Sequence, residues 1–154
     1  MNYQVKIKHL SADVEEEMVL RINGVEFTCF AAVCPYKIEE GSSYKVELTA
    51  QVFNEYLVSE LDEEASTSII QINNSFSHVI TGKLSGNRLH AGDIVFEDDV
   101  LQSDFGYLEG KMIAWKVDRI DVEFLSDTKT APSTANTSPP IKLPSTGGNN
   151  KQNK

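Results

Sequence analysis

The sequence predicts an all-β fold, either a small antiparallel barrel or a sandwich, with at most one short helix near residues 53–64. Three observations support this fold class. Apolar and polar residues alternate with a period of two through most of the chain, which is typical of half-buried strands. Short turn signals such as Asn23-Gly24 and Ser85-Gly86-Asn87 separate the alternating runs. Helical runs do not alternate with the strands, as they would in a parallel βαβ fold.

The N-terminal part of the chain predicts a first strand and a hairpin. Residues 3–7 alternate as a half-buried strand, and Asn23-Gly24 is the signal of a two-residue type I′ turn. This turn places six apolar side chains on one face, namely Met18, Leu20, Ile22, Val25, Phe27 and Cys29. On the other face Arg21 lies opposite Glu26, which predicts a cross-strand ion pair. The second hairpin strand is expected to run on towards residue 33, where Pro35 stops it.

The two cysteines, Cys29 and Cys34, lie on opposite faces of this one extended strand. In that conformation they are too far apart to form a disulfide. We therefore expect two buried, reduced thiols.

The middle of the chain predicts further strands at residues 44–52, 68–72, 77–84 and 89–96, followed by an acidic loop at residues 97–104. Between the first two of these strands the alternation is lost. Phe53, Leu57 and Leu61 recur there at a spacing of four, which predicts a short amphipathic helix.

The last part of the predicted fold is one long strand over residues 105–125, and we expect the rest of the chain to pack around it. Its apolar positions are odd-numbered over residues 113–117 and even-numbered over residues 120–124. A shift by one residue would turn one half outward, so we predict a β-bulge at Asp118-Arg119 that faces both halves towards one core. Trp115 is expected to be the largest core side chain. A compact barrel of such bent strands resembles the OB-fold group, a resemblance of fold that by itself implies no function.

Composition divides the chain into a β-barrel domain at residues 1–125 and a disordered polar tail at residues 126–154. Residues 1–125 contain 10 Lys and Arg and 22 Asp and Glu, a net charge of −12, whereas the tail contains four Lys and one Asp, a net charge of +3, which together give the −9 of the whole chain. An acidic domain repels phosphate backbones and anionic lipids, so nucleic acid is an improbable partner and another protein the expected one.

Targeting features are few. No apolar signal-peptide segment or membrane span is evident, which predicts a cytoplasmic protein, and we expect a bacterial or phage source. Residues 143–147, LPSTG, resemble the cell-wall sorting signal that sortases cleave. The apolar span and basic tail of such a signal do not follow, so we interpret the match as chance or as an added tag.

No catalytic residues and no cofactor are predicted, because the three histidines are far apart and no nucleophile signature occurs. The first hypothesis is therefore a non-enzymatic acidic β-barrel protein that binds another protein, as an inhibitor, an immunity-like protein or an adaptor. The alternative is an OB-like module for single-stranded nucleic acid that uses Lys6, Lys8, Lys45 and Tyr36. The second alternative is a metal-dependent enzyme that uses the carboxylates Asp93, Glu97, Asp98, Asp99 and Asp104. The oligomeric state stays open.

Overall fold

The computed structural model describes residues 2–125, within which there are eleven strands, one short α-helix and one 3₁₀ turn. The all-β prediction is therefore confirmed. The predictions of a disordered tail at residues 126–154 and of a chance sorting-signal match at residues 143–147 concern residues outside this range.

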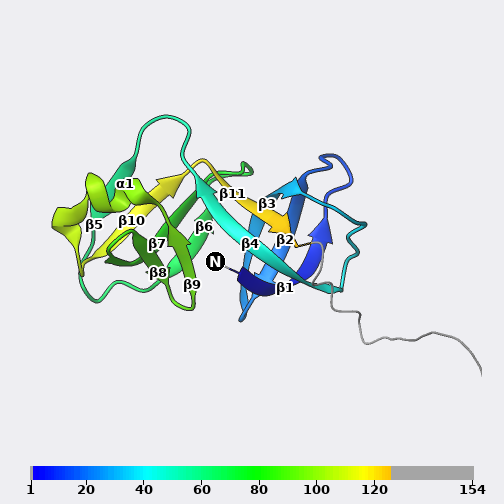
Figure 1. Ribbon diagram of the computed structural model, residues 1–154, viewed down its shortest axis with the longest axis horizontal. Coiled ribbons are helices and arrows are strands. Elements are labelled where there is room, and N and C mark those ends of the chain that lie inside the picture. Colours follow the sequence, from blue (N-terminus) through cyan, green and yellow to red (C-terminus); the bar gives the residue numbers. More distant parts are fainter. Residues whose placement is uncertain (1, 126–154) are drawn as a thin grey trace, which may run out of the picture.

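Five strands form a closed barrel in the order β1-β2-β3-β11-β4, at the right in Figure 1. Their bounds are β1 (Asn2–Leu10), β2 (Glu17–Ile22), β3 (Val25–Val33), β4 (Ser43–Gln51) and β11 (Arg119–Phe124). All neighbours are antiparallel except β3 and β11, which are parallel. The purely antiparallel prediction is wrong for this pair. Parallel neighbours need a long connection. Between β3 and β11 the chain forms β4 and then the whole second sheet.

The second sheet has six strands, ordered β5-β10-β7-β8-β9, with β6 also paired to β7. Their bounds are β5 (Leu57–Glu60), β6 (Ser68–Gln71), β7 (His78–Ser85), β8 (Arg88–Ala91), β9 (Ile94–Glu97) and β10 (Met112–Val117). Strands β6 and β8 pair with successive halves of β7, so they follow one another along one of its edges. At the junction, Gly82 is required because a Cβ there would lie 2.3 Å from the carbonyl oxygen of His90.

Strands β10 and β11 are continuous except at Asp118, where the chain passes from the second sheet into the barrel. The buried positions change from residues 113, 115 and 117 to residues 120, 122 and 124, as the sequence predicts. The cause differs from the predicted one. β10 pairs with strands of the second sheet and β11 with strands of the barrel. Asp118 is therefore the residue at which the chain passes from one sheet to the other, and not a bulge within one ladder. Both halves still contribute to one cluster of buried side chains.

The predicted hairpin is present, with Ile22 paired to Val25. Asn23 and Gly24 both have positive φ, 49° and 84°, as a type I′ turn requires. Of the six apolar side chains on this face only Val25, beside the turn, is exposed, at 37%. Arg21 and Glu26 approach to 4.0 Å on the other face.

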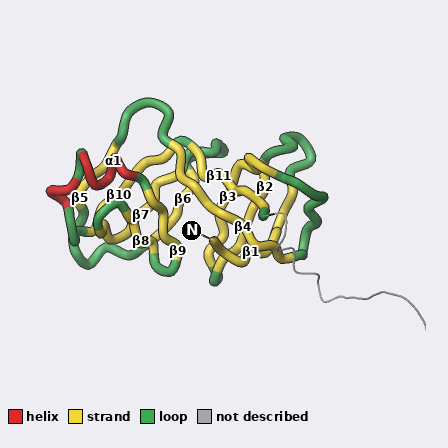
Figure 2. Tube along the Cα trace, viewed as in Figure 1, coloured by secondary structure: helices red, strands yellow, loops and turns green. Residues whose placement is uncertain are grey.

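The predicted helix near residues 53–64 is wrong, because β5 occupies this segment. Phe53 and Leu57 are exposed there, whereas Val58 packs against the core. The change from an exposed to a partly buried side chain between adjacent residues is typical of a strand. The only helical elements of the described chain are α1 (Asp99–Ser103), inside the predicted acidic loop, and a 3₁₀ turn (Gly106–Leu108), inside the predicted last strand. Figure 2 shows both at the outer end of the second sheet. The last strand therefore begins at Met112 and not at residue 105.

The core extends through both sheets. Trp115 is fully buried and is the largest of the fully buried side chains, as predicted. The ring of Tyr56 stacks on it at 6.3 Å. Two buried nitrogens, Nε1 of Trp115 and Nε2 of His78, have no hydrogen-bond partner among the described residues. Cys29 is buried as predicted, but Cys34 is exposed because it lies beyond the end of β3.

Candidate functional site

The acidic residues predicted for a metal-dependent enzyme form contacts that stabilise the local fold. Asp98 caps α1, since its Oδ1 accepts a hydrogen bond from the backbone nitrogen of Val100 at 3.0 Å. Its Oδ2 accepts one from the hydroxyl of Tyr56 at 2.6 Å. Burial, and then this bond to Asp98, raise the pKa of Tyr56 to about 12. Glu97 is paired with Arg88, whose Nε lies 2.7 Å from the carboxylate.

The remaining carboxylates of that loop do not complete a metal site. Asp99 accepts a hydrogen bond from Asn87 at 3.0 Å, and Asp104 accepts one from Ser103 at 3.1 Å. Asp93 lies in the turn between β8 and β9. Between residues 2 and 125, no three His, Cys, Asp or Glu side chains are grouped so that they could hold a metal ion.

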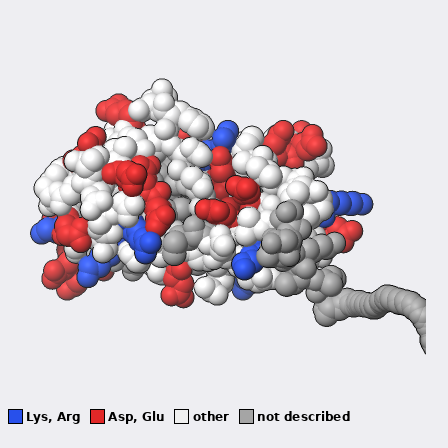
Figure 3. Space-filling model, viewed as in Figure 1, with Lys and Arg blue, Asp and Glu red and all other residues white. Residues whose placement is uncertain are grey.

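The residues of the nucleic-acid alternative are only partly brought together. Lys6 on β1 and Lys45 on β4 are close in register on the outside of the barrel, since Lys6 pairs with Ser43 and Lys45 with Gln4. Lys8 follows on the same strand, beside an irregularity in the pairing of β1 with β2. On the face shown in Figure 3, Lys and Arg side chains are scattered among Asp and Glu and do not gather into one patch.

Tyr36, the fourth of these residues, helps to close one end of the barrel. Its ring stacks on Tyr44 at 5.8 Å, and its hydroxyl donates a hydrogen bond to the carbonyl oxygen of Leu125 at 2.8 Å. It is only partly exposed. The side chain is therefore used in packing and does not stand out as a platform on which a base could stack.

A charged and aromatic cluster joins the barrel to the second sheet. The guanidinium carbon of Arg119 lies 3.9 Å from the ring centroid of Phe30 and 5.1 Å from that of Phe53. The same guanidinium forms a bidentate pair with Asp121, at 2.6 and 3.1 Å. The ring of Phe76, from the connection between β6 and β7, meets Phe30 edge-on at 5.5 Å. This cluster was not predicted from the sequence, although an Arg and an Asp two residues apart share one face of a strand.

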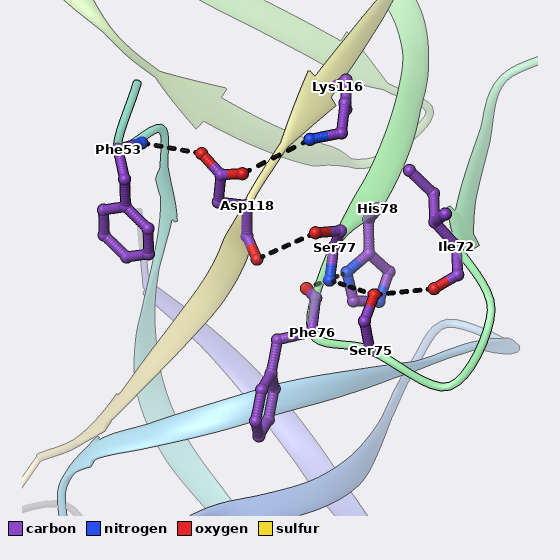
Figure 4. A network of polar contacts seen from close by, with 8 residues as sticks. All are labelled: Phe53, Ile72, Ser75, Phe76, Ser77, His78, Lys116 and Asp118. Atoms are coloured by element: carbon purple, nitrogen blue, oxygen red, sulfur yellow. Dashed lines mark hydrogen bonds and ion pairs between the residues drawn. The ribbon is translucent and has the colours of Figure 1, made fainter. Parts of the chain in front are cut away.

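Asp118 connects the segments that meet where β10 becomes β11 (Figure 4). Its Oδ2 accepts a hydrogen bond from the backbone nitrogen of Phe53 at 2.7 Å, and its Oδ1 lies 3.3 Å from the Nζ of Lys116. Its carbonyl oxygen accepts a bond from the hydroxyl of Ser77 at 3.4 Å. The hydrogen bond from Phe53 is the main cause that lowers the pKa of Asp118. These contacts fix how the two sheets adjoin.

The outer face of the second sheet carries a row of side chains that run across four strands. The cross-strand pairs are Ile70 with Val79, Val79 with Lys116, and Lys116 with Leu57. The two ends of the row are exposed, Ile70 at 60% and Leu57 at 46%. We call these four residues the outer row. The outer row was not predictable from the sequence, because its members come from strands that are separated along the chain.

The edges of the second sheet differ in how they are covered. At β9, the hydroxyl of Tyr3 accepts a hydrogen bond from the backbone nitrogen of Val95 at 2.6 Å and lies 3.4 Å from its carbonyl oxygen. Strand β6 lies beside β3 of the barrel. Strand β5 pairs with β10 along one side, and no described residue pairs with its other side. It is therefore the free edge of this sheet.

An acidic pocket adjoins the end of β5. It has a volume of about 370 Å³ and is lined by residues 60–63 and 109–112. Four lining residues are acidic, namely Glu60, Asp62, Glu63 and Glu109, against one basic residue, Lys111. The Nζ of Lys111 lies 3.6 Å from the carboxylate of Glu60. The pocket is thus a place of excess negative charge at the free edge.

Fold and surfaces together define an all-β protein in which a closed barrel carries an attached sheet. The model of a protein family described as "Uncharacterised conserved protein UCP019853" matches residues 1–125, and the chain belongs to this family. No curated protein and no solved structure matches the chain. Within residues 2–125, no helix has the length and apolar character needed to cross a membrane.

Proposed function

We propose that this chain is a non-enzymatic protein-binding module, an inhibitor, an immunity-like protein or an adaptor, whose partner packs against the outer face of the second sheet. The outer row carries this proposal. Its apolar side chains, Ile70, Val79 and Leu57, lie in one line across the sheet. The charged end of Lys116 is drawn to Asp118, so its apolar stem contributes to the same surface. Exposed apolar surface that is continuous in this way is typical of protein interaction sites.

The polar groups of the chain support a binding role over a catalytic one. Asp98, Glu97 and Arg119 each have partners that stabilise the fold. The net charge of −12 over residues 1–125 favours a partner with positive potential, which such a charge attracts from a distance. A cytoplasmic location in a bacterium or phage is part of this proposal.

The test is site-specific photo-crosslinking with the full chain. A photoreactive side chain at position 70 or 57 should give one discrete crosslinked protein, and the same probe at Thr49, exposed on β4 of the barrel, should not. Purified, that protein should bind the wild-type chain and lose affinity for the Ile70→Asp variant. Equal crosslinking from Thr49, or unchanged affinity of Ile70→Asp, would contradict the proposal.

A second candidate function concerns the barrel. Its order, β1-β2-β3-β11-β4, with the single parallel pair β3–β11, is the strand order of OB-fold barrels, and we propose on this ground that the barrel is OB-like. Lys6 and Lys45 then lie on its outer surface. Mobility-shift titration with single-stranded oligonucleotides at low salt tests this function, and binding should weaken in a Lys6→Ala, Lys45→Ala double variant. No shift at micromolar protein removes it.

A further inference from the structure

We infer that the free edge of β5 binds an extended, basic segment of the protein partner, which adds a strand to the second sheet and places a Lys or Arg side chain in the adjoining acidic pocket. This inference rests on the proposed function and specifies the mode of binding and the chemistry of the partner. Three features of the molecule support it: the backbone of β5, the coverage of the other edges, and the charge at the end of the strand.

The backbone geometry shows which groups β5 offers. The nitrogen of Leu61 donates a hydrogen bond to the carbonyl oxygen of Met112 at 2.8 Å, just beyond the last paired residues of β5 and β10. In an antiparallel ladder, hydrogen-bonded and non-bonded positions alternate. The backbone groups of Ser59 and Leu57 therefore point to β10, as those of Leu61 do. Those of Val58 and Glu60 point outward, to the side where no described residue pairs.

The other strand edges of the described chain lie beside the barrel or are bonded to it in part. The barrel is closed and has no edge. The outward backbone groups of Val95 on β9 are bonded to Tyr3, and β6 lies beside β3. Proteins commonly cover or block the edges of their sheets, because an open edge pairs readily with another chain. No barrel strand of the described chain pairs with β5, and the outward backbone groups of Val58 and Glu60 can pair with an added strand. This mode of recognition is called β-augmentation.

The side chains around β5 define the chemistry of that strand. Leu57, at 46% exposure, ends the outer row at this edge, so an added strand needs an apolar side chain beside it. Glu60 lies at the other end of β5 and lines the pocket, together with Glu63 and Glu109. Because carboxylates outnumber the single Lys111 there, a cationic side chain is favoured. An extended segment in which apolar and basic residues alternate satisfies both requirements.

The first experiment uses short synthetic peptides with a fluorescent label and the purified full chain, measured by fluorescence anisotropy. The probe is a peptide of alternating Val and Lys. One matched control replaces Lys by Glu, and a second keeps every Lys but has Pro at alternate Val positions, so it has the same charge and cannot pair as a strand. The probe should bind, and both controls should bind at least about tenfold more weakly, as expected when one net hydrogen bond or more is lost.

The second experiment separates the backbone of the edge from its charge. Glu60→Pro removes the carboxylate and the outward N–H, and it leaves the hydrogen bonds to β10 intact because that N–H points away from β10. Glu60→Ala removes the carboxylate alone. The Pro variant should bind the Val–Lys peptide about tenfold more weakly than the Ala variant. Far-ultraviolet circular dichroism and the melting temperature confirm that both variants fold.

Three results would contradict the binding of an added strand at β5. Equal affinities of the two Glu60 variants, or equal binding of the proline-containing control, overturn it, since attraction would then be by charge alone. Light scattering reports whether the full chain pairs with itself. A dimer that Glu60→Pro converts to a monomer also overturns it, because a second copy is then the occupant. If crosslinking at position 70 still captures a partner whose affinity is the same for both variants, the proposed function holds and only the edge mode fails.

Discussion

The hydroxyl of Tyr3 lies 2.6 Å from the backbone nitrogen of Val95 and so connects the first strand of the barrel to an edge of the second sheet. The two residues are 92 positions apart in the chain. The phenol both accepts a bond from this nitrogen and approaches the carbonyl oxygen of the same residue at 3.4 Å. A single side chain thus supplies to Val95 the bonds that a neighbouring strand would supply.

The Tyr3→Phe variant should therefore be less stable. It keeps the ring but leaves the N–H of Val95, which is 9% exposed, without a partner. We expect the free energy of unfolding to fall by about 1–2 kcal/mol in urea titration. Tyr107→Phe, at an exposed position, is the control and should leave the stability unchanged. If the free energy of unfolding of Tyr3→Phe equalled that of the wild type, solvent would satisfy the N–H of Val95 equally well.

His78 should make the stability depend on pH. Its side chain is fully buried, and its Nδ1 lies 2.8 Å from the carbonyl oxygen of Phe76, which assigns the proton of the neutral ring to Nδ1. Burial lowers the pKa of His78 and outweighs the opposite effect of that hydrogen bond. The unfolded state therefore takes up a proton first as the pH falls. The stabilising contribution of neutral His78 is complete above about pH 6.5 and declines as the pH falls towards the lower pKa of the folded state.

Melting temperatures measured between about pH 7.5 and 5 test this expectation. The slope of stability against pH should be smaller in His78→Gln than in the wild-type chain. His9→Gln, at an exposed position on β1, controls for the loss of a histidine. An identical slope in His78→Gln and in the wild type would assign the pH dependence to the carboxylates.

The two thiols should differ in reactivity. Burial is the main cause that raises the pKa of Cys29, and Asp121 adds to it; burial also raises the pKa of the more accessible Cys34. Since Cys29 is inaccessible and Cys34 is exposed, a chromogenic disulfide reagent should modify Cys34 alone in the native chain and both in denaturant. The Cys34→Ser variant should show no rapid reaction. Rapid labelling of Cys29 in that variant would mean that the barrel opens readily.

Trp115→Ala should be the most damaging of these substitutions. Trp115 lies on β10, which pairs with β5 and β7, and its indole is fully buried and stacks on Tyr56. Removing such a side chain from a core costs roughly 3–5 kcal/mol, a large part of the stability of an ordinary domain. Val33→Ala, at an exposed position, should change the free energy of unfolding by no more than about 0.5 kcal/mol. A silent Trp115→Ala variant would show that this strand is not the centre of the fold.

Deletion of residues 126–154 should leave the melting temperature nearly unchanged. Apart from Ile141 and Leu143 the segment has few large apolar side chains, and its charged side chains are four Lys and one Asp. Such charges are screened over about 8 Å at physiological salt and contribute little each. Differential scanning calorimetry of the shortened and complete chains makes the comparison. A large decrease in the shortened chain would place part of the fold beyond residue 125.

Local patterns explain which elements were predictable from the sequence. At Asn23-Gly24 the turn chemistry and the alternation agree, and the register of the hairpin follows from them. At Asp118 the shift in alternation was visible, but only the pairings of the two halves reveal that the strand changes sheets. At Leu57 the spacing of apolar residues favoured a helix, but the segment is a strand because it pairs with β10, far along the chain, with Leu57 opposite Lys116.

The candidate site was less predictable than the fold, because it is made almost wholly of non-local pairings. Ile70 and Leu57 are unremarkable in sequence and become one surface only when Val79 and Lys116 lie between them. The acidic residues near Asp98 were conspicuous in sequence, but their contacts are with a helix terminus and with neighbouring side chains. Charge density along the chain thus indicated a loop and the residue that caps its helix.

The points at which the chain leaves and re-enters the barrel lie side by side, because Gln51, the last residue of β4, pairs with Arg119, the first of β11. In the barrel alone, these two strands are the arms of a simple hairpin, which a turn of about two residues can connect. The whole second sheet is thus an insertion at a hairpin tip, the type of site where chains accept added domains most readily. In evolutionary terms, a family with this architecture can acquire, exchange or lose its second sheet at a single position of the gene while the barrel strands keep their pairing.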